Sequence, residues 1–154
     1  MAKNNLYSDF EKKMNRIKNH IAEEVAPQVN NLLKESVSYS LIDWYNDYEP
    51  KTYERTYNFM KILERTRTSG KGNILTFSID SSAMTPYQGF NKSQPLNTGT
   101  AFDYMFMNGE HGHGRWMMHR SLPPYMYVDR DISTGWDGRL DKIVNKKIEE
   151  ILRK

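Results

Sequence analysis

Apolar residues recur every three or four positions through the first third of the chain. The members of this repeat are Leu6, Phe10, Met14, Ile17, Ile21, Val25, Val29, Leu33, Val37, Leu41, Trp44 and Tyr48. The spacing places them on one stripe of an α-helix. Because Pro27 lacks an amide hydrogen and its ring collides with the preceding turn, we expect a kink or a break near Ala26. At about 1.5 Å per residue such a helix is longer than a small domain is wide, so part of it should project toward a neighbour. A self-contained helical hairpin is the alternative.

A different pattern follows Pro50, where segments become short and rich in β-branched and aromatic residues. Segments 59–67 and 74–80 have this character, and the glycine-containing segment 69–73 lies between their centres. Two such runs joined by a tight, glycine-rich connection predict a β-hairpin.

The rest of the chain supplies two more predicted elements. Segment 100–107 has aromatic side chains at alternate positions, which predicts a third strand. Apolar residues at helical spacing over 136–152 predict a C-terminal helix. The predicted fold class is therefore α+β, in a single domain over residues 1–154: a long N-terminal helix kinked near Pro27, a small antiparallel sheet of three or more strands, and a C-terminal helix.

Two long stretches, 81–99 and 108–133, fit no regular pattern. Both exceed ordinary loop lengths, which indicates either a missed element or a role outside the domain. Both also carry large apolar side chains. From these side chains we predict the residues of a subunit interface, namely Met84, Tyr87, Phe90, Trp116, Met117 and Met118.

Composition narrows the function classes. The 154 residues include no cysteine, which excludes disulfides, thiolate metal sites and a cysteine nucleophile. The mean hydropathy of -0.80 is low, as in chains that share buried surface between subunits. The 22 basic and 19 acidic residues nearly balance, so the charge permits nucleic-acid binding without indicating it. No apolar stretch approaches the roughly 18 residues of a membrane span, so we expect a soluble chain that is not secreted and has no membrane partner.

One histidine-rich segment offers a route to metal chemistry. His111, His113 and His119 lie close together in sequence, and imidazoles suit zinc and related metals. The nearest acidic residues are Asp103, Glu110 and Asp129. The spacing matches no established ligand motif, so we predict no metal, no cofactor and no catalytic residue. A metal-dependent nuclease that uses the three histidines is the alternative.

Basic and aromatic side chains interleave between residues 53 and 71. In a strand Lys61, Arg65 and Arg67 would share one face, and the neighbouring aromatic rings could stack on bases. Glu54 and Glu64 lie among them, as on an ordinary solvated sheet face. A nucleic-acid-binding module is therefore a further alternative.

Three segments carry a resemblance to a known family. Residues 48–57 (YEPKTYERTY) fit x-x-P-x-x-T/Y-x-R-T/S, residues 102–112 (FDYMFMNGEHG) fit an aromatic strand running into E/N-G-x-H/T-G, and residues 123–125 (PPY) are similar to an R-P-F stretch before a last helix. With this order of elements the chain resembles the small bacteriophage morphogenesis proteins that join head to tail or complete the tail. In that family the first segment connects the long helix to the sheet. The junction residues expected to brace that helix are Tyr53, Arg55 and Tyr57.

The resemblance implies a function without catalysis. It implies a virion protein of the neck or tail that forms a ring, through which DNA passes during ejection. The implied partners are further copies of the chain, other neck, portal or tail proteins, and transiently the DNA. The implied location is the virion, assembled in the host cytoplasm, and no cofactor is expected.

Overall fold

The computed structural model describes residues 2–47, 57–82, 84, 98–109 and 122–153, and most of this part of the chain is helical. Its elements in chain order are α1 (Ala2–Asn46), the 3-10 helix η1 (Asn58–Arg65), β1 (Thr66–Lys71), β2 (Ile74–Ile79), α2 (Thr98–Asn108), α3 (Pro124–Ser133) and α4 (Gly135–Arg153). Within the described ranges the sheet consists of two antiparallel strands. The predicted α+β fold with three or more strands is therefore wrong.

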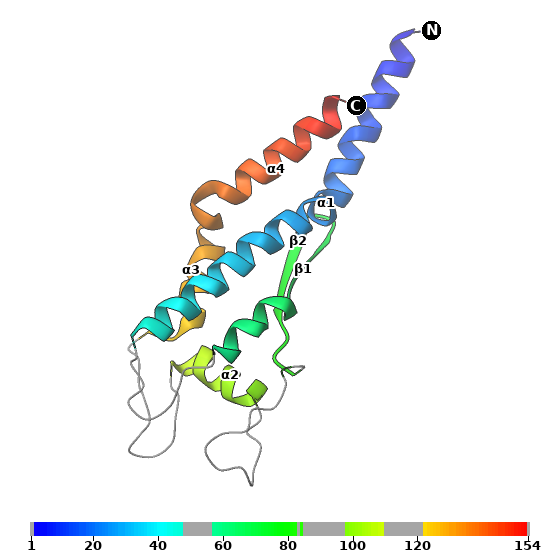
Figure 1. The fold of residues 1–154 in the computed structure, drawn as a ribbon. Coiled ribbons are helices and arrows are strands. Elements are labelled where there is room, and N and C mark those ends of the chain that lie inside the picture. Colours follow the sequence, from blue (N-terminus) through cyan, green and yellow to red (C-terminus); the bar gives the residue numbers. More distant parts are fainter. Residues whose placement is uncertain (1, 48–56, 83, 85–97, 110–121, 154) are drawn as a thin grey trace, which may run out of the picture.

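Helix α1 is the axis about which the other elements are arranged. The β-hairpin, α3 and α4 contact it, and α2 packs against α3. Figure 1 shows α4 running beside α1 in the opposite direction, so the N and C ends lie at the same end of the molecule. The blue start of α1 extends beyond the red end of α4, which is the projection expected of so long a helix. None of the described helices combines the length and apolarity needed to cross a bilayer.

The core lies along the second half of α1. From Val25 onward the inward side chains of this helix are almost inaccessible to solvent, and every other element except β1 adds apolar side chains to the same cluster. Representative buried members are Leu33 and Leu41 of α1, Ile62 of η1, Phe102 of α2 and Val128 of α3. Burying each such side chain stabilises the fold by roughly 1.5–3 kcal/mol. The second half of α1 is therefore the scaffold of the molecule.

Helix α1 changes direction where the hairpin meets it (Figure 1). The amide of Ala22 donates a hydrogen bond of 3.0 Å to the carbonyl of Gly72, in the hairpin turn. Gly70 lies so close that a Cβ there would overlap the backbone of Ala22 and Glu23. Pro27 removes a further intrahelical hydrogen bond just beyond this contact. The expected kink thus takes the form of a bend that begins before the proline, without a break in the helix.

The segment predicted as a third strand, 100–107, belongs to helix α2. Phe102 and Met105 are buried, whereas Tyr104 is 49% exposed. A strand would have placed Tyr104 on the same face as Phe102, but a helix pairs positions three or four apart. Gly109 ends the helix with a left-handed φ of 73°, and its amide donates to the Met105 carbonyl at 2.7 Å. The apolar residues of this segment therefore satisfy the helical period as well as the alternating pattern of a strand.

Much of the segment predicted as the first strand, 59–67, is the 3-10 helix η1. Phe59 and Ile62 are buried three residues apart, which is the repeat of a 3-10 helix. The strand begins at Thr66, whose hydroxyl donates to the Ile62 carbonyl at 3.1 Å. From Thr66 opposite Ile79, β1 pairs with β2 as far as the turn. The predicted hairpin is present, with a shorter first strand.

One helix lies within the stretch 108–133, for which the sequence predicts no regular structure. Helix α3 starts at Pro124, a residue whose fixed φ suits the first helical position, and Val128 attaches it to the core. The predicted C-terminal helix is present as α4. Its regular part begins only after Gly138, because the residues before it have left-handed backbone angles.

Candidate assembly surfaces

The projecting part of α1 carries exposed apolar side chains along one face. Leu6 is 78% exposed, Tyr7 73%, Phe10 56% and Met14 44%. Positions three or four apart are neighbours on a helix surface, so these four residues form one continuous strip, here called the N-terminal stripe. Scattered exposed apolar residues are ordinary, but a contiguous set on a soluble protein marks a contact surface.

The end of α4 sets the limit of the covered part of α1. Lys13 Nζ donates to the carbonyl oxygen of Leu152 at 3.3 Å and pairs with Asp9 at 3.0 Å. Ahead of Lys13 the helix extends for about 16 Å at 1.5 Å per residue, and Figure 1 shows its start beyond the end of α4. The N-terminal stripe therefore lies mainly on the free part of the helix.

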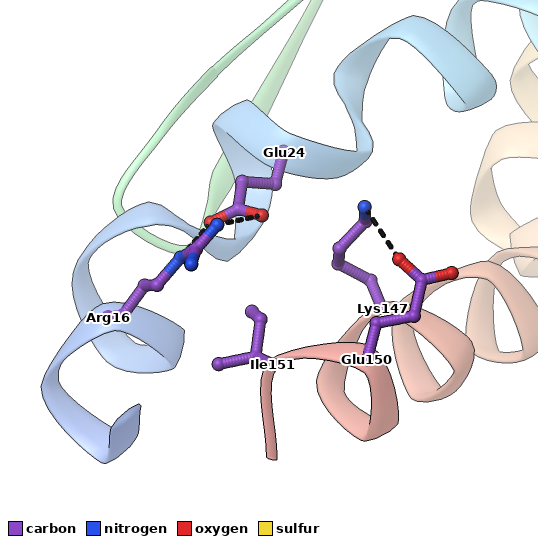
Figure 2. A pocket seen from close by; sticks show the side chains of 5 residues that line it. All are labelled: Arg16, Glu24, Lys147, Glu150 and Ile151. Atoms are coloured by element: carbon purple, nitrogen blue, oxygen red, sulfur yellow. Dashed lines mark hydrogen bonds and ion pairs between the residues drawn. The ribbon is translucent and has the colours of Figure 1, made fainter. Parts of the chain in front are cut away.

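A small polar joint lies between α1 and the end of α4 (Figure 2). Arg16 donates two hydrogen bonds to the Glu24 carboxylate, at 2.6 and 2.9 Å, and thereby bridges the bend. The hydrogen bond from Arg16 lowers the pKa of Glu24. Lys147 pairs with Glu150 at 2.9 Å on the facing side of the joint. The cavity between them measures about 10 Å³, room for about one water molecule, so we interpret the joint as structural.

A groove between α1 and α3 lies toward the other end of α1. It has a volume of about 510 Å³. Residues that line it include Tyr39, Ile42, Asp43 and Asn46 of α1 and Tyr127 and Arg130 of α3. Tyr39 is 66% exposed and Ile42 44%. The Arg130 guanidinium lies 5.6 Å from the centre of the Tyr127 ring. This α1/α3 groove therefore offers both apolar surface and charge.

A buried polar network holds α3 and α4 against α1 beside the groove. The Ser36 hydroxyl donates to Asp131 Oδ2 at 2.7 Å. The indole N–H of Trp136 donates to Ser36 Oγ at 2.8 Å. Ser36 and Trp136 are 3% and 5% exposed, so these hydrogen bonds satisfy polar atoms that water does not reach. Hydrogen bonds between side chains of α1, α3 and α4 thus hold one wall of the groove in place.

The connection from α3 to α4 has an unfavourable backbone conformation. Gly135, Trp136, Asp137 and Gly138 follow one another with φ of 60°, 53°, 54° and 81°. Left-handed angles suit glycine, but they crowd the Cβ of other residues. The burial and hydrogen bond of Trp136 offset this strain. The turn directs α4 back along α1.

An ion pair ties the start of the regular part of α4 to α1. Arg139 donates two hydrogen bonds to the Glu35 carboxylate, at 3.0 and 2.7 Å. The hydrogen bond from Arg139 lowers the pKa of Glu35. Both side chains are more than a third exposed, so the pair adds geometric restraint more than stability.

Comparison with known proteins places the chain in a family. A family model named YomN matches residues 4–135, which is most of the chain. The chain belongs to the YomN family. YomN is a Bacillus phage-derived family, so the predicted bacteriophage origin is confirmed at the level of a phage protein. No curated protein matches the chain, and neither does any solved structure.

The YomN match covers both surfaces described above. It includes the N-terminal stripe, the hairpin that bends α1, and the whole α1/α3 groove. It ends at Gly135, where the left-handed turn begins, so the regular part of α4 follows the match.

Two of the predicted interface and junction residues of this YomN-family chain are described. Met84 is 9% exposed and belongs to the core cluster. The Tyr57 ring centre lies 4.8 Å from that of Tyr45, which links η1 to the end of α1. The others lie outside the described residues: Tyr53, Arg55, Tyr87, Phe90, Trp116, Met117 and Met118. Their assignments to an interface or a junction stay predictions.

The histidine cluster of the alternative metal site also falls outside the described residues. This applies to His111, His113, His119 and Glu110. Where the structure describes the chain, no three histidine, aspartate or glutamate residues are grouped to hold a metal. His20 pairs with Glu23 at 3.2 Å, and Asp103 and Asp129 are exposed on α2 and α3. The metal-dependent nuclease therefore stays an untested alternative.

The basic residues proposed to share a strand face do not do so. Lys61 and Arg65 lie on η1, and only Arg67 is on β1. Arg67 donates to the backbone carbonyl of Glu64 at 2.6 Å, which directs its guanidinium to its own turn. This prediction is wrong, although nucleic-acid binding by other arrangements of these residues stays an alternative.

Sequence reasoning missed the α1/α3 groove. The residues that line it come from two helices that are about 90 positions apart in the sequence, so no local motif predicts it. One signal was available. Tyr39 and Ile42 are large apolar residues that fall outside the helical repeat of Val37, Leu41 and Trp44, and apolar residues on the solvent face of a helix indicate a second surface.

Proposed function

We propose that this chain is a structural protein of a bacteriophage neck or tail, which connects head to tail or completes the tail. In this proposal it forms a ring of identical subunits that docks to other virion proteins, and it has no catalytic role. Membership of a phage-derived family supports the phage setting. The neck or tail assignment rests on the resemblance of three sequence segments. Assembly would take place in the host cytoplasm, and the finished ring would belong to the virion.

The observation that carries the proposal is the N-terminal stripe. Complete burial of a large apolar side chain contributes roughly 1.5–3 kcal/mol. The four side chains of the stripe project on a free helix, so within one chain they gain little of this energy. A second molecule is needed to bury them, and closed rotational symmetry buries the same surface on every subunit. Self-association is the role this surface supports best.

Three kinds of partner follow from the proposal. The first is another copy of the chain. The second is a neck, portal or tail protein that meets the faces of the ring. The third is DNA, which contacts the ring transiently as it passes through. The proposal includes no membrane and no cofactor.

The experiment that tests the proposal compares the mass of the purified chain in solution with that of a stripe variant. We expect wild-type protein to sediment as an oligomer and to form rings in electron micrographs. Tyr7→Ser/Phe10→Ser should sediment as a monomer with unchanged helix content, because both side chains are exposed. Asn15→Ser, an exposed polar position off the stripe, is the matched control and should assemble like wild type.

Two results together would overturn the proposal. One is wild-type protein that stays monomeric at every accessible concentration. The other is failure of that protein to co-assemble with portal or tail components of its phage.

A further inference from the structure

We propose that strand β2 of one subunit pairs in the antiparallel direction with β2 of a second copy, so that two hairpins form one four-stranded sheet. The contact is two-fold, because the same strand edge contributes on both subunits. It goes beyond the proposed function, since it uses a surface other than the N-terminal stripe and does not depend on a ring.

The outer edge of β2 presents backbone groups that pair with no other strand in the described part of the chain. Lys71 and Ile74 flank the two-residue turn of the hairpin, and residues in that position form a hydrogen-bonded pair. Such pairs alternate along an antiparallel ladder. The Asp80 amide donates to the Arg65 carbonyl at 3.2 Å, which continues the same alternation. The residues in between direct their N–H and C=O groups away from β1: Leu75, Phe77 and Ile79.

Strand β2 lacks the features that protect free sheet edges from pairing. Those features are charged side chains, proline and β-bulges. The sequence of β2, ILTFSI, contains no charged residue, no proline and no glycine, and its register with β1 has no bulge. Its side chains are mostly β-branched or aromatic, which favours the extended conformation. The edge is therefore suited to accept another strand.

The strand that a second copy can offer to this edge is β2 itself. Strand β1 makes most of the contact between the hairpin and α1, and β2 makes little. Gly70 of β1 lies against the backbone of Ala22, whose amide donates to the Gly72 carbonyl. Helix α1 thus lies against β1, whereas the outer edge of β2 points away from this contact.

One register pairs every outward backbone group of the two strands. With Phe77 opposite its own copy, Leu75 lies opposite Ile79 of the partner subunit, and all three positions form hydrogen-bonded pairs. These three side chains are partly buried against the core of their own subunit. Pairing surrounds them with further apolar side chains and places two aromatic rings opposite each other at the centre.

The solvent-facing side of the strand fits the same register. Thr76 and Ser78 are exposed there, and each lies opposite the other across the interface, where hydroxyl groups can hydrogen-bond. Ile74 lies opposite the Asp80 position. No charged side chain therefore opposes a like charge between the two β2 strands. A single pair of short strands is a weak contact, so we expect the dimer only in concentrated protein.

Amide exchange measured by NMR reads the edge directly. The Tyr7→Ser/Phe10→Ser variant is used, because it lacks the stripe and therefore isolates the second contact. In dilute protein the amides of Leu75 and Phe77 should exchange faster than those of Thr76 and Ser78, which bond to β1. In concentrated protein exchange at Leu75 and Phe77 should slow several-fold, while sedimentation shows dimers.

A pair of charge variants in the same background tests the register. Thr76→Glu/Ser78→Glu places carboxylates opposite each other across the interface, although within the hairpin position 78 faces Arg67. This variant should remain monomeric in concentrated protein and lose the slowed exchange. Thr76→Gln/Ser78→Gln is the matched control, since it has nearly the same shape without charge, and it should dimerise.

Disulfide trapping gives a second readout of the same pairing. The chain has no cysteine, so introduced thiols are the only ones present. A mixture of Thr76→Cys and Ser78→Cys subunits should form disulfide-linked dimers several-fold faster than either variant alone. Ser69→Cys, at an exposed position on β1, is the control and should form few.

The outcomes decide between β2 pairing and other occupants of the edge. Slow exchange at Leu75 and Phe77 in dilute, monomeric protein would mean that the same chain already covers the edge, and it would overturn the inference. Trapping no faster in the mixture than in single variants, or equal dimerisation of the Glu and Gln variants, would also overturn it. The ring experiment fails or succeeds separately, because the exchange and charge-variant tests use protein without the stripe.

Discussion

The first twenty residues of α1 and the last twenty follow the same amphipathic repeat, yet they end in opposite environments. Phe10 and Met14 are about half exposed, whereas Leu33 and Leu41 are completely buried. The hairpin, α3 and α4 cover the second region, and α4 ends at the level of Lys13. An apolar stripe on a helix therefore specifies a face that will be covered. It does not specify whether the cover belongs to the same chain.

The comparison predicts that truncation of a large apolar side chain lowers the free energy of unfolding strongly in the second region of α1 and hardly at all in the first. Leu41→Ala should lower the free energy of unfolding by about 3 kcal/mol, because it leaves a cavity in the core. Phe10→Ala should change it by less than about 0.5 kcal/mol, as expected of an exposed position. Urea unfolding at a concentration where the wild-type protein is monomeric provides the measurement. Equal losses for the two variants would show that the projecting helix is covered within the monomer.

The boundary between the two regions is the hairpin contact, and Gly70 should be its most sensitive position. A methyl group there would overlap the backbone of Ala22 and Glu23, so Gly70→Ala should destabilise the protein by about 2 kcal/mol. Ser69→Ala, which changes an exposed neighbour on the same strand, is the matched control and should have little effect. Thermal unfolding followed by circular dichroism measures both. A Gly70→Ala variant as stable as the control would mean that the hairpin does not pack tightly on the bend.

The turn between α3 and α4, two of the helices that cover the second half of α1, contains backbone strain that one substitution should release. Asp137 has a φ of 54°, an angle that a glycine adopts more easily. Asp137→Gly should therefore raise stability by about 1 kcal/mol. Asp141→Gly, in the regular part of α4, should lower it, because glycine is a poor helix former. Chemical denaturation of the two variants side by side gives the signs, and a loss in both would argue against a left-handed turn at Asp137.

The smallest expected effect concerns the ion pair that ties α4 to the covered region. Arg139 lowers the pKa of Glu35 below its value of 4.5 in an unfolded chain. A depressed carboxyl pKa stabilises the fold above about pH 4.5, and this contribution disappears as the pH falls through the lower folded value. Glu35→Gln should therefore be slightly less stable than wild type at pH 7. The difference should shrink as the pH is lowered below 4.5, and urea midpoints measured across this range test it. A difference that grows on acidification would contradict the assigned partner.

Sequence periodicity was sufficient for the elements that have a long, regular repeat. Helix α1, the β-hairpin and α4 were all predicted, because twelve apolar positions in register or a glycine-containing turn leave few alternatives. It failed for α2, where Phe102, Tyr104 and Phe106 satisfy a strand pattern and Phe102, Met105 and Phe106 satisfy a helical one. In short segments rich in large apolar residues both periods fit, and tertiary packing decides between them.

The candidate surfaces were harder to predict than the fold. The N-terminal stripe is visible in the sequence as part of the long repeat, but its exposure depends on where α4 ends. The α1/α3 groove and the Ser36, Asp131 and Trp136 network join residues about 100 positions apart. Contacts of this kind have no local signature, since they arise from the packing of α3 and α4 against α1.

The hydrogen bond between Ala22 and Gly72 has a consequence for any assembly of this chain. It fixes the direction in which the free end of α1 leaves the body, because the bend forms where the hairpin holds the helix. If the projecting end of α1 contacts the next subunit of the proposed ring, this direction sets the angle between neighbouring subunits and thereby the number of copies in the ring. In that proposal the hairpin controls the curvature of the ring, although it lies outside the N-terminal stripe. Under the proposed function, substitutions at the hairpin glycines should alter the diameter of the ring before they abolish assembly.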